Sequence, residues 1–503
     1  MKGRLRAVVW PDYEGGKAVR RLTKALCALL AALTLAAGAL AEPAPGAPGF
    51  LNGLTGQEPL SLDLTAQVSA WPDLSEGTLA ALNAWLGTAR LSLRLSETAG
   101  NLIFSLDGKT ALTAVAEQDS RGAGLSLEVP GALPATRYLS GAETPPWTLL
   151  LGAESRLPDF AGAAEALQAV AFAAMPGLLP HEKPSRASVS LGAAGRGASR
   201  LDYVLDAEET GLFWQAVAPE LLPALARLIG ALAGASALPD LSGVKPQGGL
   251  TVRRVLDKAG ADLGFQVTGA FALPGGARRL SLSFGRSEKG TYLNLKLPAL
   301  KGGDTLEARL NLKTPPGKME GDWRVRSVSG KARQDLSGDV DLRLETLDAQ
   351  QRVTGLLTVR AQSRGGEAPQ DVRLEARPDL AFGNGALSGI LALRQSEGRA
   401  LVREVSLGLR AAPGKLPAAP EPLAEVDLRL AGPEVMEREA ARLRASLAPL
   451  VRQALLALPL PERLLVLHDL GRDGRTQGDS VAPPEPPLNE FTVSDRLETE
   501  VLP

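Results

Sequence analysis

The chain has 503 residues, of which 45% are hydrophobic, 22% charged and 4% aromatic. These fractions are typical of globular proteins and exclude a wholly disordered chain. The single cysteine excludes a disulfide scaffold and cysteine-based zinc or iron–sulfur sites. The two histidines, His181 and His468, leave little basis for imidazole metal sites or serine–histidine–aspartate catalysis. We therefore expect no cofactor, no metal site and no catalytic residues.

The first 41 residues have the features of a secretory signal peptide. Basic residues between Lys17 and Lys24 precede an uninterrupted apolar stretch over 25–41, which ends in the small-x-small sequence Ala39-Leu40-Ala41. We predict cleavage near Ala41 and export to the periplasm, the cell wall or the extracellular space. The alternative is that this segment is kept as a membrane anchor. Cleavage would remove the single cysteine, Cys27, and we expect no membrane-spanning segment after it.

Cleavage also changes the charge of the protein. The segment 1–41 contains seven basic and two acidic residues, so its removal changes the formal net charge from −1 to −6. Nucleic-acid affinity comes largely from clustered cationic side chains. The mature chain is therefore not expected to bind nucleic acid.

The pattern downstream predicts a flexible lead over 42–58 and an N-terminal α+β module over 59–240. Apolar and polar residues alternate over 60–68, which is typical of a strand with one wet face. A short helix is predicted over 73–87, capped by Asp73 and ended by Gly87. Further strands follow, with Asp107-Gly108 as a tight hairpin turn. Two apolar helical stretches complete the module, at 159–179 and at 210–235, the second broken by Pro219 and Pro223.

The second half of the chain is dominated by short alternating segments. Over 241–432 such segments recur with glycine, proline, asparagine or aspartate between them, which predicts an antiparallel β-meander. A C-terminal helical segment is predicted over 433–470, with Pro433 in its first turn. The Pro-rich polar tail over 471–503 is predicted to be disordered. The expected class is α+β: a long, curved antiparallel meander with a few apolar helices packed on one face and a C-terminal helix.

Two groups of residues are candidates for function. Asp335, Asp339, Asp341 and Glu345 form the densest acidic group. Alternation places Asp339, Asp341 and Glu345, with Arg343, on the wet face of one predicted strand, and we interpret the group as a solvated surface rather than as a calcium or hydrolase site. The aromatic residues Phe213, Trp214, Phe265, Phe271 and Phe284 lie on apolar faces of the predicted helices and strands. They predict either a packed core or the lining of an apolar ligand groove.

The alternating strands over 60–129 and 250–430, with the helical stretches 159–179 and 210–235, give the chain an architectural resemblance to exported lipoprotein carriers of the LolA/LppX type. That resemblance implies half-barrels whose open apolar side holds acyl chains. The folded part is about twice the size of one such module, so the chain forms either one half-barrel or two joined modules. No diagnostic motif of the family is present.

Three functions remain open from the sequence. The first is an exported, non-enzymatic protein that binds a lipid or another amphiphile in an apolar groove between sheet and helices. The second is a structural or protein-interaction component of the cell envelope, with an envelope protein as its partner and a fully packed core. A minor alternative is an exported hydrolase that uses carboxylates alone.

Overall fold

The computed structural model describes residues 60–96, 99–119, 122–139, 160–233, 241, 244–273, 276–300, 304–329, 332–347, 350–365, 370–383, 386–414 and 421–456. The predicted signal peptide over 1–41, the lead over 42–58 and the tail over 471–503 lie outside these residues. The C-terminal helical segment predicted over 433–470 is described up to residue 456.

Most of the described chain forms one sheet of 20 strands. The N-terminal strands are β1 (Leu60–Ala70), β2 (Ala89–Leu95), β3 (Ala99–Leu106), β4 (Lys109–Asp119), β5 (Gly122–Val129) and β6 (Leu133–Leu139). Next come β7 (Glu182–Ser185), β10 (Ser199–Leu205) and a separate small hairpin of β8 (Val189–Ser190) and β9 (Arg196–Gly197).

The meander then supplies β11 (Lys245–Leu256), β12 (Asp262–Leu273), β13 (Gly276–Ser287), β14 (Gly290–Leu300), β15 (Asp304–Lys313), β16 (Lys318–Ser329), β17 (Ala332–Leu347), β18 (Gln350–Arg364), β19 (Gln370–Gly383), β20 (Ala386–Glu397) and β21 (Ala400–Pro413). The short strand β22 (Ala424–Asp427) is the last strand in the described part of the chain.

Most strands pair with their neighbours in sequence, and two pairings, β21 with β1 and β22 with β6, join segments far apart in the chain. Strand β7 pairs with β10, and the sheet then runs in sequence order from β10 to β21. Strand β21 pairs with β1, which joins the end of the meander to the N-terminal strands β1 to β6. Every pair in the sheet is antiparallel except β22 with β6. The predicted antiparallel meander is therefore confirmed, and it extends across both predicted modules.

The described helices are few: α3 (Glu76–Thr88), α5 (Phe160–Ala174), α6 (Ala207–Ala233) and α7 (Pro433–Leu456), with short 3₁₀ turns at Met175–His181 and Gly192–Ala194. The α+β class is corrected accordingly, because the chain is mainly β with helices added to one long sheet. The hairpin turn at Asp107-Gly108 is confirmed, with φ of 52° and 73°, as such a turn requires.

Two details of the helices differ from the sequence prediction. Helix α3 is capped by Ser75, whose hydroxyl accepts a hydrogen bond from the Thr78 N–H at 3.2 Å, because Ser75 rather than Asp73 directly precedes the first helical residue. Helix α6 runs through Pro219 and Pro223 without a break. Each proline removes one backbone hydrogen bond, and packing of the buried face of α6 on the sheet compensates for that loss.

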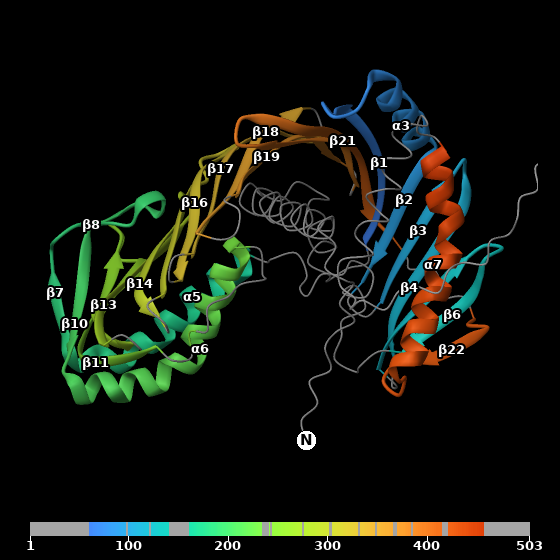
Figure 1. Cartoon of the computed structure of the whole chain (residues 1–503). Coiled ribbons are helices and arrows are strands. Elements are labelled where there is room, and N and C mark those ends of the chain that lie inside the picture. Colours follow the sequence, from blue (N-terminus) through green and yellow to red (C-terminus); the bar gives the residue numbers. More distant parts are fainter. Residues whose placement is uncertain are drawn as a thin grey trace, which may run out of the picture.

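The sheet is bent into an arch whose two limbs carry the helices (Figure 1). Helices α5 and α6 pack on the limb formed by β10 to β16, α7 lies over the opposite limb near β6, and α3 packs against β1 and β2. By length and composition, Ala207–Gly230 in α6 is the one described segment apolar enough to cross a membrane. Leu228 and Ile229 within it are fully buried against the sheet.

Candidate functional site: a continuous apolar face

The strand register aligns apolar side chains of neighbouring strands in rows. Because side chains alternate between the two faces of a strand, the members of one row share a face. One row crosses from β19 to β5 through Phe382, Leu387, Ala411, Leu62, Leu93, Leu102, Ala114 and Leu127. A second row passes through Leu380, Gly389, Leu409, Leu64, Leu91, Phe104 and Leu112. We call the face that carries these rows the apolar face.

Helices α5 and α6 close the apolar face on one limb. The five aromatic residues identified from the sequence meet here. Phe265, Phe271 and Phe284 are at most 1% exposed, whereas Phe213 and Trp214 are half-buried. The rings of Trp214 and Phe271 lie edge to face at 5.3 Å, and those of Phe265 and Phe284 are 5.7 Å apart. These rings are covered by the protein's own side chains; that they line a ligand groove stays a prediction.

The indole of Trp214 is held at this limb by a hydrogen bond as well as by ring packing. Its Nε1 donates to the backbone carbonyl of Val244 at 3.1 Å. A tryptophan with a satisfied N–H and an aromatic neighbour is a rigid packing element. The limb under α5 and α6 therefore has the character of an ordinary hydrophobic core.

Helix α7 lies over the other limb of the sheet. The Tyr138 hydroxyl on β6 donates a 3.4 Å hydrogen bond to Oε2 of Glu439 on α7, and Glu439 is buried. Burial and the neighbouring Glu439 carboxylate raise the pKa of Tyr138 above its usual value. The hydroxyl therefore stays protonated and remains a donor that ties α7 to the sheet.

Between these limbs the apolar face is only partly covered. Ala411, Leu93 and Val68 are buried, but seven of its residues on β21, β1 and β2 are half-buried: Leu62, Leu64, Ala66, Leu91, Val405, Leu407 and Leu409. We call these seven residues the central apolar face. They lie in the middle of the sheet with paired strands on both sides, so their exposure is not that of a sheet edge. Aromatic content could not locate this region, but the leucine alternation over 60–68 and 405–409 marks it in the sequence.

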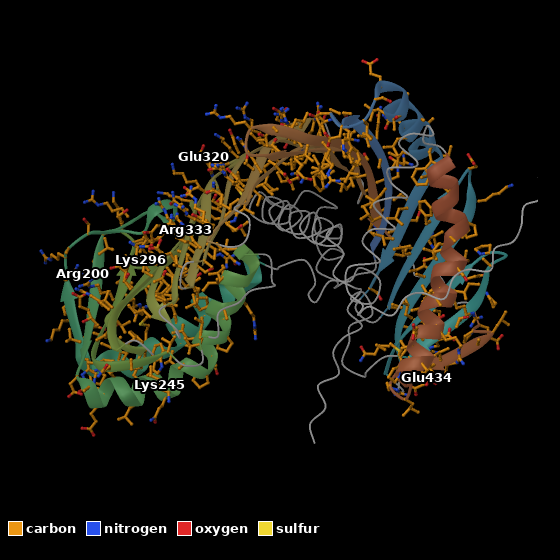
Figure 2. All side chains as sticks on the ribbon, viewed as in Figure 1. Arg200, Lys245, Lys296, Glu320, Arg333 and Glu434 are labelled. Atoms are coloured by element: carbon orange, nitrogen blue, oxygen red, sulfur yellow. The ribbon has the colours of Figure 1, made fainter. Side chains whose placement is uncertain are left out.

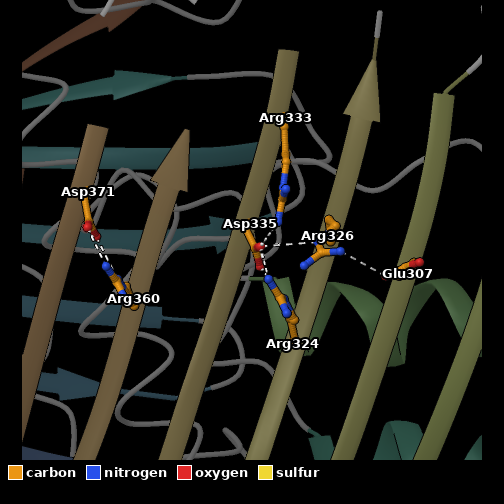
Figure 3. Close-up of polar contacts among 7 residues, drawn as sticks. All are labelled: Glu307, Arg324, Arg326, Arg333, Asp335, Arg360 and Asp371. Carbon is orange, nitrogen blue, oxygen red and sulfur yellow. Dashed lines mark hydrogen bonds and ion pairs between the residues drawn. The ribbon is translucent and has the colours of Figure 1, made fainter. Parts of the chain in front are cut away.

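The opposite face of the sheet carries charge. Figure 2 shows Arg200 and Glu320 on the outer side of the arch. The most buried carboxylate there is Asp335, at 5% exposure, which accepts hydrogen bonds from Arg324, Arg326 and Arg333 (Figure 3). Burial by itself would raise the pKa of Asp335, but the arginine hydrogen bonds outweigh it and lower that pKa to about 2.

The acidic residues identified on this strand from the sequence thus have two different environments. Asp339, Asp341 and Glu345 are exposed, as a solvated face requires, but Asp335 is buried in an arginine cluster. Similar two-pronged pairs join Arg352 to Asp379 and Arg360 to Asp371. Among the described residues, no group of histidine, cysteine, aspartate and glutamate is arranged to hold a metal ion.

Comparison with known proteins assigns the chain to no family. No protein-family model and no curated protein matches the chain. Among solved structures, OccK5 (OpdH) of Pseudomonas aeruginosa matches at 7% identity and a TM-score of 0.16, with 70% of this chain and 95% of that chain covered. OccK3 (OpdO) of the same organism matches at 9% identity and a TM-score of 0.13, covering 70% and 94%. Similarity at this level supports no statement about fold or function.

Proposed function

We propose that this protein is an exported, non-enzymatic protein that binds a lipid or another amphiphile on its apolar face. One observation carries the proposal: apolar residues of successive strands form a continuous surface through the middle of the sheet, and seven of its central residues are half-buried rather than fully covered. Soluble proteins rarely leave large contiguous apolar surfaces uncovered without a binding role. Export is part of the proposal because of the predicted signal peptide.

The size of the central apolar face suits an acyl chain. On β21 it extends from Val405 to Leu409, which is about 14 Å at about 3.4 Å per residue. The hydrocarbon core of a bilayer is about 30 Å thick, so the chains of one leaflet span about 15 Å. A single acyl chain could therefore lie along β21 with apolar contact over nearly its whole length.

The expected affinity follows from the area that a ligand would cover. Completing the burial of a half-buried leucine stabilises the complex by about 1 kcal/mol. The five leucines with Val405 and Ala66 therefore contribute at most about 7 kcal/mol, which sets a lower limit of about 10 μM on the Kd before the cost of immobilising the ligand. Such an affinity suits a protein that releases its ligand as well as binding it.

The arch is compatible with both architectures that the resemblance to LolA/LppX-type carriers implies, one half-barrel or two joined modules. Each limb with its helices, α5 and α6 or α7, corresponds to one half-barrel module in the two-module interpretation. The sheet runs unbroken from one limb to the other through the β21–β1 pair, so we propose that the modules share one apolar surface.

A structural role in the cell envelope is the second candidate, and the length of the sheet favours it. Twenty strands at about 4.8 Å spacing span about 90 Å along the curve, which is long enough to connect separated envelope partners. The hydrolase alternative has less support. Asp335, Asp371 and Asp379 each accept hydrogen bonds from arginines, and these hold them as carboxylates.

Native mass spectrometry of the purified mature protein tests the two candidates. Amphiphile binding predicts adducts of lipid mass that disappear on delipidation and return when fatty acid is added back. A clean protein mass, together with no uptake of a fluorescent fatty acid, contradicts amphiphile binding. Under the structural candidate the same clean mass is expected, with no spectroscopic change on adding fatty acid.

A further inference from the structure

The central apolar face has a cation at one end. Arg403 lies on β21 two residues before Val405, so both side chains point to the same face of the sheet. The register confirms this, because Val405 is opposite Leu393 and Arg403 is opposite Gln395 on β20. Among the described inward-facing positions of β20, β21 and β1, Arg403 is the one basic residue.

Neutral groups hold Arg403 in place. Its Nε donates a 2.8 Å hydrogen bond to Oε1 of Gln395. Its guanidinium lies over the ring of Trp71, 5.6 Å from the centroid, and this cation–π contact leaves its charge uncompensated. The residue is half-buried, so its orientation is restricted while part of it stays in contact with solvent.

The outer-face arginines provide the contrast. Arg324, Arg352 and Arg360 each donate two hydrogen bonds to one aspartate. Within the described part of the chain, no carboxylate lies at ion-pair distance from Arg403. Glu404 follows Arg403 directly on β21 but points to the opposite face, Glu397 lies at the exposed tip of the β20–β21 hairpin, and neither makes a described contact with Arg403. Arg403 is therefore oriented by the fold without being neutralised by it.

We propose that Arg403 binds the anionic headgroup, phosphate or carboxylate, of an amphiphile whose acyl chain lies on the central apolar face. This rests on the proposed amphiphile binding and specifies its ligand class. The terminal nitrogens of a guanidinium match the geometry of phosphate and carboxylate oxygens. Nε bound to Gln395 and the ring of Trp71 set the plane of the guanidinium, so the ligand meets a pre-oriented donor pair at the end of its acyl-binding surface.

The test compares amphiphiles with one chain length and different headgroups. The neutral fluorophore N-phenylnaphthylamine reports occupancy of the apolar face, and dodecyl phosphate, dodecanoate and dodecyl maltoside compete for it below their micelle concentrations. We expect the anionic competitors to bind about tenfold more tightly than the maltoside, since a hydrogen-bonded charge pair contributes about that factor. The phosphate and carboxylate competitors show which headgroup is preferred.

Variants assign the preference to Arg403. Arg403→Gln is expected to abolish the anionic preference without changing the maltoside affinity, and Arg403→Lys to retain part of it. Arg410→Gln is the matched control, because Arg410 is an exposed arginine on the outward face of the same strand. Thermal unfolding of each variant shows whether the fold is kept.

The outcomes separate the two proposals. Equal displacement by all three amphiphiles, or an anionic preference that survives in Arg403→Gln, overturns the role of Arg403 and leaves amphiphile binding intact. If neither the fluorophore nor any amphiphile binds, amphiphile binding itself is overturned and the role of Arg403 with it. A preference lost equally in Arg403→Gln and Arg410→Gln indicates a general charge effect and also overturns the assignment.

Discussion

Replacing Leu407 with aspartate separates a ligand-binding face from an ordinary core. Leu407 is half-buried, so an aspartate there keeps contact with water in the free protein, and the free energy of unfolding falls by about 1–2 kcal/mol. A bound acyl chain would cover that carboxylate, and burial of an unpaired charge costs several kcal/mol. Even a cost of about 2 kcal/mol weakens the Kd for a fluorescent fatty acid about 30-fold.

The matched control for this variant is Ile390→Asp. Ile390 is 54% exposed on the neighbouring strand β20 and faces outward, opposite Gly408. The assay is a fluorescence titration, accompanied by urea unfolding of each variant. Equal weakening of binding by both variants, or unchanged binding in Leu407→Asp, would refute the location of the ligand on the central apolar face. A loss of stability above about 4 kcal/mol in Leu407→Asp would instead identify a packed core.

Two other predictions concern stability. Asp335→Asn removes the charge that pairs with three arginines. The folded-state pKa of Asp335 is lowered to about 2, so the carboxylate adds about 2 kcal/mol to the free energy of unfolding. This stabilisation is present above about pH 4 and is lost as the pH falls towards about 2. Urea unfolding should therefore show a smaller pH dependence between about pH 5 and pH 2 in the variant, and an unchanged dependence contradicts the cluster's role. Trp214→Arg should lower the melting temperature, because it removes the hydrogen bond to Val244 and the packing on Phe271; unaltered melting contradicts the core role of Trp214.

Much of the fold could be predicted from local patterns. The alternation of apolar and charged residues reports directly which residues form strands, because side chains on a strand point to opposite faces. The helical stretches at 159–179 and 210–235 were placed within a few residues of α5 and α6. The break predicted at Pro219 and Pro223 was wrong, because tertiary packing holds α6 together where helix propensity alone would not.

The candidate site was harder to predict. The five aromatic residues were the candidates for a ligand groove, and the structure brings them together between α6 and the sheet, within the main hydrophobic core. The central apolar face consists of leucine, valine and alanine residues that look like those of any other strand. Arg403 was not identified from the sequence: the two-residue period places it on the face of Val405, but only the structure shows its contacts with Gln395 and Trp71.

The sequence by itself determined which residues of each strand share a face, because that depends only on the two-residue period of an extended chain. It also determined the polarity of each face, because leucine and valine alternate with arginine and aspartate along each strand. Only the tertiary structure decided that β1 pairs with β21, a contact between segments more than three hundred residues apart. That pairing makes the apolar rows continuous, and the placement of the helices at the two limbs leaves the middle of those rows half-exposed.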